Sequence, residues 1–82
     1  MVRVLFDEKY IKVFSKITSR DLKERIIKQV ERIELNPQIG KPMRYDRKGT
    51  REVYIKPYRL AYYFDSTKKK VYITDFYHKD KQ

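Results

Sequence analysis

The chain has 82 residues, which is enough for one small domain but too short for a dinucleotide-binding domain or a barrel enzyme. Its 21 Lys and Arg side chains outnumber 11 Asp and Glu. A net charge of +10 on so small a domain indicates a polyanionic partner, nucleic acid before membrane. The absence of Cys excludes disulfide scaffolds, zinc ribbons and cysteine nucleophiles. With a single His and no cluster of carboxylates, we expect no metal site and no cofactor.

Membrane and secretory signals are also missing. The longest apolar run, from Leu60 to Phe64, is far too short to span a membrane. Arg3, Asp7 and Glu8 interrupt the N-terminal segment, so the apolar region of a signal peptide is absent. We therefore expect a soluble, cytoplasmic protein with no membrane partner.

The first half of the chain predicts a strand followed by two helices. Residues 1–6 alternate in hydrophobicity, and Asp7 then provides a candidate N-cap. Thr18-Ser19 provides a second cap, and Asn36-Pro37 ends the second helix, since the residue before a proline is disfavoured in the α region. The apolar positions expected to face the core are Val2, Val4 and Phe6 in the strand, Tyr10, Ile11, Phe14 and Ile17 in the first helix, and Leu22, Ile26, Ile27, Val30 and Ile33 in the second.

The second half predicts a loop over residues 36–50 and then three strands. The strands cover residues 52–56, 58–65 and 70–77, with a hairpin connection between the last two and a polar tail over residues 78–82. In the middle strand, alternation places Leu60 and Tyr62 on one face and Arg59 on the other.

This order of elements predicts a fold of the α+β class. The helices come as a pair and do not alternate with strands. We therefore expect one twisted, largely antiparallel sheet, with a two-helix hairpin on one face and the other face open. Residues 1–35 carry a net charge of +3 and residues 36–82 carry +7, so most of the positive charge is expected on the loop, the sheet and the tail.

Three short motifs resemble the RelE/ParE superfamily of toxins from toxin–antitoxin pairs. They are Asn36-Pro37 with Gly40-Lys41, Arg51-Glu52, and Tyr58-Arg59-Leu60-Ala61-Tyr62, followed by a last strand ending in Tyr77-His78-Lys79. The order and spacing of these motifs, more than any one of them, carry the resemblance. It covers essentially the whole chain and implies a single RelE-like toxin domain over residues 1–82.

The resemblance implies one of two activities. RelE-type members cut messenger RNA on the ribosome without a metal, because a 2′-hydroxyl of the RNA attacks its own phosphate. ParE-type members act on DNA gyrase. A third reading is an RNA- or ribosome-binding module with little cutting activity. The resemblance also implies a cognate acidic antitoxin that folds over the toxin and forms a complex with it, for which a heterotetramer is one arrangement.

The family's motifs mark four candidate catalytic residues. Arg59 matches the arginine of the "YR" motif, and its planar guanidinium suits a phosphate; the alternative is an arginine that only pairs with Asp75 or Glu52. His78 matches a C-terminal histidine able to carry a proton near neutral pH, although a lone His in a polar tail is often simply solvated. Lys79 matches a further basic position, and Arg51 of the "RE" motif completes the set.

A second group of residues is expected to hold RNA without reading its sequence. These candidates are Lys41, Arg44, Arg47, Lys48, Lys56 and Tyr77, with a solvated charged loop as the alternative for the loop cations. Tyr54 and Tyr63 are expected on the same sheet face as Arg59 or Lys56, either stacking on bases or buried. Two family features are missing. Met43 and Arg44 stand where related toxins carry a carboxylate, and no tyrosine follows the last strand.

Overall fold

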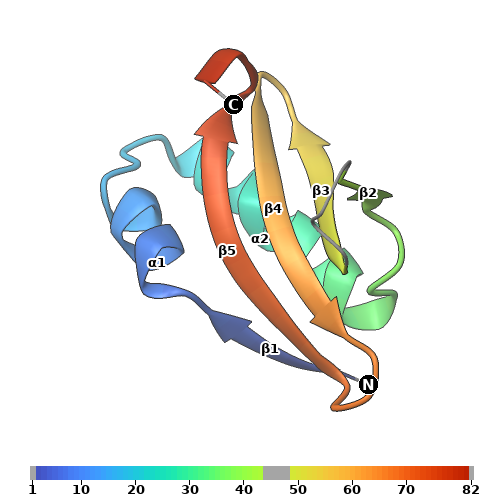
Figure 1. The fold of residues 1–82 in the computed structure, drawn as a ribbon. Coiled ribbons are helices and arrows are strands. Elements are labelled where there is room, and N and C mark those ends of the chain that lie inside the picture. Colours follow the sequence, from blue (N-terminus) through green and yellow to red (C-terminus); the bar gives the residue numbers. More distant parts are fainter. Residues whose placement is uncertain (1, 44–48, 82) are drawn as a thin grey trace.

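The computed structural model describes residues 2–43 and 49–81 (Figure 1). Its elements in chain order are β1 (Arg3–Phe6), α1 (Glu8–Ser15), α2 (Arg20–Leu35), β2 (Lys41–Pro42), β3 (Thr50–Ile55), β4 (Tyr58–Asp65), β5 (Lys70–His78) and a short 3-10 helix, η1 (Lys79–Lys81). Arg44, Arg47 and Lys48, which were predicted to contact RNA, lie outside the described residues.

Within these residues, five strands form one mixed sheet in the order β1-β5-β4-β3-β2. The pairs between β2, β3, β4 and β5 are antiparallel, whereas β1 runs parallel to β5. Figure 1 shows α2 across one face of the sheet and α1 beside β5, beyond the end of β1. The predicted α+β architecture is confirmed. The parallel β1–β5 pair follows from the chain crossing the sheet through two helices before it returns.

Both helices begin where the sequence predicted and α2 also ends there, but α1 ends at Ser15, before Ile17, which was predicted to lie in it. The Asp7 carboxylate accepts a hydrogen bond from the Lys9 amide, and the Ser19 hydroxyl accepts one from the Leu22 amide. Both side chains thus satisfy amides that a helix N-terminus leaves unpaired. Helix α2 ends at Leu35 with Asn36 as its C-cap. Within the described residues, no helix is long and apolar enough to cross a membrane.

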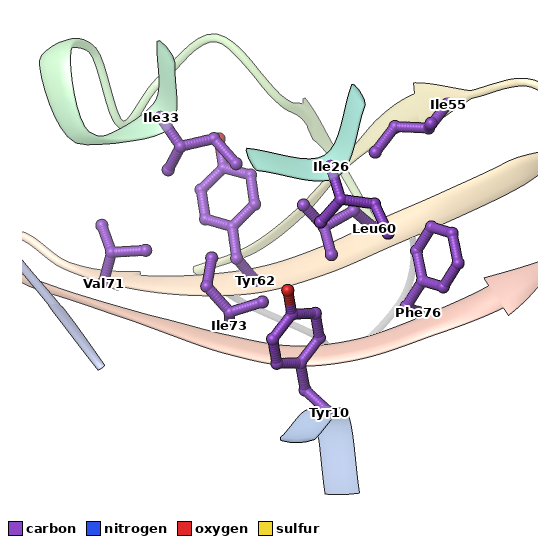
Figure 2. Packing of buried hydrophobic residues seen from close by; sticks show 9 residues of the cluster. All are labelled: Tyr10, Ile26, Ile33, Ile55, Leu60, Tyr62, Val71, Ile73 and Phe76. Atoms are coloured by element: carbon purple, nitrogen blue, oxygen red, sulfur yellow. The ribbon is translucent and has the colours of Figure 1, made fainter. Parts of the chain in front are cut away.

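The core lies between α2, α1 and the covered face of the sheet. Figure 2 shows Leu60 and Tyr62 of β4 pointing toward Ile26 and Ile33 of α2. The buried cluster consists of Tyr10, Ile26, Ile33, Ile55, Leu60, Tyr62, Val71, Ile73 and Phe76. Because β4 and β5 supply most of its strand residues, the outward side chains of the same two strands sit on a rigid base.

The structure corrects several predictions. Ile11 and Ile27 are half exposed instead of buried, because only one stripe of each helix reaches the core. Phe6 is half exposed at the end of the edge strand β1, where its ring stacks on Tyr10. Residues 41–42, predicted as loop, form a two-residue strand that pairs with β3. The last strand extends one residue further than predicted, so His78 ends β5 and is not part of a free tail.

The segment after α2 is held by two side chains from the sheet. The Tyr62 hydroxyl donates to the Pro37 carbonyl (2.7 Å) and accepts from the Gly40 amide (2.9 Å). Arg51 Nη1 donates to the Gly40 carbonyl (2.7 Å) and the Gln38 carbonyl (3.2 Å). A Cβ atom at Gly40 would lie 2.5 Å from the Tyr62 hydroxyl, so only glycine fits this close approach.

We predict that Tyr62→Phe lowers the free energy of unfolding by about 1–3 kcal/mol, because it leaves the Gly40 amide and the Pro37 carbonyl without their partner. Urea denaturation at pH 7 measures this change. Tyr54→Phe is the matched control, since Tyr54 is exposed. Equal stabilities of the two variants would contradict a structural role for the Tyr62 hydroxyl.

Candidate functional site

The face of the sheet opposite α2, which we call the open face, carries the polar side chains of β3, β4 and β5. Strand pairing sets Tyr54, Arg59 and Tyr77 in one row across these strands. The next row contains Glu52, Ala61 and Asp75. All of these positions alternate with core residues such as Ile55 and Leu60, so they point away from the covered face.

A buried carboxylate organises the centre of the open face. Glu52 is only 8% exposed. Its Oε1 lies 3.3 Å from Arg59 Nη1, and its Oε2 accepts a hydrogen bond from the Tyr77 hydroxyl at 3.0 Å. The Arg59 guanidinium also lies over the Tyr54 ring, 5.0 Å from its centroid. We call Glu52, Arg59 and Tyr77 the Glu52 cluster; it connects three adjacent strands and fixes the Arg59 guanidinium in place.

This arrangement matches the alternative in which Arg59 pairs with Glu52. The pair does not by itself exclude phosphate binding, because it does not bury the Arg59 side chain completely. The Arg59 side chain keeps about a fifth of its surface exposed on the open face. Arg59 is therefore both anchored and reachable.

Tyr77 is a neutral hydrogen-bond donor at this site. Burial raises the pKa of its hydroxyl, and the hydrogen bond to Glu52 and the charge of Glu52 raise it further. The nearby Arg59 charge lowers the pKa of Tyr77, but the net direction is upward. The hydroxyl therefore holds its proton throughout the physiological range.

A β-bulge decides that Tyr77, and not His78, shares the open face with Arg59. Ala61 pairs with Asp75 and Tyr62 pairs with Ile73, which leaves Thr74 as an extra residue in β5. The Thr74 hydroxyl donates to the Ala61 carbonyl at this point. An extra residue reverses the alternation of every residue after it, and bulges commonly re-aim side chains in this way.

As a result, His78 lies on the covered side of the sheet. Its ring meets the Tyr58 ring edge-on at 5.5 Å, and Tyr58 stacks on the buried Phe76. His78 Nδ1 accepts a hydrogen bond from the Asp80 amide (3.2 Å) and lies 3.7 Å from Asp80 Oδ2. The structure therefore places His78 and Arg59 at the same end of the sheet but on opposite faces.

The remaining predicted residues lie apart from the Glu52 cluster. Arg51 is on the covered face, where it holds the Gly40 carbonyl. Lys79 follows β5 in η1 and is exposed. Lys41 of β2 pairs with Glu52, and Lys56 follows β3; both side chains are exposed. Lys41 and Lys56 thus add positive charge at the margin of the open face.

Sequence reasoning missed a second surface, an apolar groove between α1 and α2. The groove has a volume of about 380 Å³ and is lined by Phe6, Tyr10, Ile11, Phe14, Ile27, Val30 and Glu31. The signal was the doubled apolar positions Tyr10-Ile11 and Ile26-Ile27. In each pair, one residue packs in the core and its neighbour remains half exposed.

A sequence model of one protein family, described as the ParE toxin of the type II toxin–antitoxin system parDE, matches residues 5–82. The chain belongs to the ParE toxin family. It is thus a toxin of a type II toxin–antitoxin system, and the predicted membership of the RelE/ParE superfamily is confirmed. No curated protein sequence matches the chain.

Solved structures of this superfamily share the fold of this ParE-family chain. The toxin–antitoxin complex RelBE of Escherichia coli contains a chain that is 19% identical with a TM-score of 0.83, covering 95% of this chain and 96% of that one. The RelBE2 complex of Mycobacterium tuberculosis gives 22% identity and a TM-score of 0.81 over 95% and 98%. A YoeB/ParE toxin from Agrobacterium tumefaciens gives 13% identity and 0.82 over 94% and 98%. These similarities confirm the RelE-like fold.

We predict that Glu52→Gln lowers the pKa of the Tyr77 hydroxyl, because the substitution removes a negative charge that disfavours the phenolate. A pH titration of ¹³C-labelled tyrosine followed by NMR measures the shift. Glu24→Gln, at an exposed position of α2, is the control and should leave the pKa of Tyr77 unchanged. An unchanged Tyr77 pKa in Glu52→Gln would show that the hydrogen bond between the two residues does not form.

Proposed function

We propose that this toxin is a ribosome-dependent endoribonuclease that cuts messenger RNA through attack by the RNA's own 2′-hydroxyl. The observation that supports the proposal is the Glu52 cluster. It presents an anchored, partly exposed arginine beside a protonated tyrosine on the sheet face opposite α2. This chemistry needs no nucleophile from the protein. It needs a cation fixed near the phosphate and groups that move protons.

The proposed roles follow from what each step requires. The 2′-oxygen forms a bond to phosphorus while the bond from phosphorus to the 5′-oxygen breaks, so negative charge builds on the phosphate oxygens. Arg59 stabilises that charge, and it does so without reorganising because Glu52 already holds it. The Tyr77 hydroxyl gives its proton to the leaving 5′-oxygen and must leave Glu52 Oε2 to do so; its raised pKa means that it is fully protonated but a weak acid.

His78 and Lys79 act from the end of the sheet in this proposal. His78 ends the strand that carries Tyr77, and an imidazole can both accept and donate a proton. His78 accepts the proton of the attacking 2′-hydroxyl. Because His78 lies on the covered side of the sheet, this step requires the RNA to bend around the end of β5. Lys79, which is exposed there, contributes positive charge toward the phosphate. Arg51, engaged with the Gly40 carbonyl, serves by fixing the segment before β2.

Inhibition of DNA gyrase is the second candidate function, and the ParE name of the matching family favours it. Translation of a defined message in a purified system, followed by toeprinting, separates the candidates. A message cut at codons in the ribosomal A site supports the ribonuclease. Normal translation together with impaired DNA supercoiling supports gyrase inhibition. Ribosomes that bind the protein while the message stays intact indicate a binding module.

We further propose a cognate acidic antitoxin as partner. The related chains from Escherichia coli and Mycobacterium tuberculosis were both solved as toxin–antitoxin complexes. In this chain, the groove between α1 and α2 offers half-exposed aliphatic side chains, Ile11 and Ile27, to an apolar helix of the antitoxin. Two toxins and two antitoxins would make a heterotetramer. Because ribosomes are the target, the proposal places the protein in the cytoplasm.

We predict that Arg59→Ala lowers the rate of cleavage about 100-fold, equivalent to about 2.7 kcal/mol of transition-state stabilisation. His78→Ala should lower it by a similar factor if His78 carries a proton in the reaction. Single-turnover cleavage on programmed ribosomes measures both rates. Lys28→Ala, on the exposed side of α2, is the control. A folded Arg59→Ala variant that cuts at the parental rate would rule out the arginine assignment.

We predict that Ile27→Asp preserves toxicity but weakens rescue by the antitoxin, because a charge in the groove opposes an apolar helix. The parental protein expressed alone should stop growth, and coexpression of the neighbouring gene should restore it. Cells expressing Ile27→Asp should remain inhibited under coexpression, whereas Lys28→Ala should be rescued normally. Normal rescue of Ile27→Asp would move the antitoxin away from this groove.

A further inference from the structure

The open face exposes an unusual concentration of tyrosine. Four of the seven tyrosines in the described residues lie on it. The Tyr77 hydroxyl is hydrogen-bonded to Glu52. The other three, Tyr54, Tyr63 and Tyr72, form what we call the tyrosine platform. Tyr54 is 55% exposed and Tyr63 is 38% exposed. These exposed fractions are much larger than those of tyrosines on the covered face, such as Tyr62, so the two rings are accessible to a ligand.

The platform has two stacking positions. At the first, the Tyr54 ring lies beside the Arg59 guanidinium, 5.0 Å away. At the second, the Tyr63 and Tyr72 rings lie side by side with their centroids 6.2 Å apart. Arg59 and Tyr63 are four residues apart on β4, which separates the two positions by about 13 Å along the strand.

The second position is fixed by the backbone. Gly49 has a φ of 79°, and a Cβ atom there would lie 2.6 Å from Cε1 of the Tyr63 ring. Glycine therefore allows the chain to pass directly against one side of this ring. The ring is held in place while more than a third of Tyr63 stays exposed, so a flat ligand meets a surface that is already ordered.

The charges around the platform favour an anionic ligand. Arg3 of β1 and Lys41 of β2 are exposed at opposite edges of the sheet, both on the open face. Three acidic residues of this face already have partners: Glu52 has Arg59 (3.3 Å), Asp75 has Lys9 (3.2 Å), and Asp65 accepts from the Thr67 and Lys68 amides (3.1 Å each). Among the described residues, Arg3 and Lys41 form no salt bridge, which favours their contact with phosphates in a chain of net charge +10.

The platform differs in chemistry from the groove between the helices. The groove offers aliphatic side chains, Ile11 and Ile27, which suit an apolar protein helix. The open face offers separate aromatic rings among cations, and this combination suits unpaired nucleic-acid bases. A base stacks on an aromatic ring whatever its identity, and each such contact contributes substantially to the affinity for single strands.

We propose, building on the ribonuclease function above, that the tyrosine platform stacks unpaired bases of single-stranded RNA and lets the free protein hold RNA without the ribosome. The RNA strand lies along β4. One base stacks on Tyr54, another base stacks on Tyr63 and Tyr72, and a phosphate between these two bases lies near Arg59. The bases of a duplex are stacked on their neighbours and have no free faces, so duplex RNA does not bind to the platform. Stacking does not require the 2′-hydroxyl, so single-stranded DNA of the same sequence binds as well and is not cut.

The test measures, by fluorescence anisotropy, binding of the free, full-length protein to labelled oligouridine and its DNA counterpart. Both probes have about 12 nucleotides, which is long enough to span the two stacking positions. Tyr54→Leu and Tyr63→Leu should each weaken binding by about tenfold, or about 1.4 kcal/mol, while the phenylalanine variants keep parental affinity. Lys28→Ala is the control. Inorganic polyphosphate, a polyanion without bases, should bind the parental and leucine proteins equally.

A measurement on the unaltered protein covers the case in which a leucine variant fails to fold. The chain has no Trp, so its intrinsic fluorescence comes from tyrosine. Saturating oligouridine should quench this fluorescence, and duplex RNA of equal charge should quench it much less. Leucine variants that bind like the parent, equal quenching by duplex, or absence of single-strand binding would each overturn the proposal. If the protein stacks oligouridine but leaves the message on the ribosome uncut, only the ribonuclease function is refuted.

Discussion

The Glu52 carboxylate is the interaction on which the open face depends. It is buried in a chain with a large excess of positive charge, and it binds Arg59 through one oxygen and Tyr77 through the other. Removing a carboxylate from water costs free energy that only good partners offset. The arrangement around Glu52 supplies a cation and a hydroxyl from two different strands. The carboxylate therefore fixes three strands and two functional side chains at once.

The same strands build the core and the candidate site. In β4, Leu60 and Tyr62 pack under α2 while Arg59 and Tyr63 point outward. Side chains on well-packed strands are held more firmly than side chains on loops, which suits the proposed contact with a phosphate in a fixed orientation. The aliphatic groove lies elsewhere, between α1 and α2, so the fold separates a surface suited to a protein helix from one suited to nucleic acid.

Much of this fold follows from local sequence signals. Asp7 and Ser19 cap the helices as predicted, and the β4 strand spans the predicted residues because its apolar positions alternate strictly. The placement of His78 does not follow, since alternation from Val71 and Ile73 would put His78 on the open face. The extra residue Thr74 reverses that pattern, and a bulge depends on the pairing partner, which local sequence does not specify. Strand β2 has only two residues and likewise depends on its pairing with β3.

A double-mutant cycle tests most directly whether Glu52 holds the open face together. Glu52→Gln, Tyr77→Phe and the double variant are unfolded by urea at pH 7, and the coupling energy is obtained from the four unfolding free energies, the parental value included. A hydrogen bond to a buried, charged carboxylate predicts a coupling of about 1 kcal/mol or more. Additive effects, with a coupling energy near zero, would contradict the account, because the interaction between Tyr77 and Glu52 would then contribute nothing to stability.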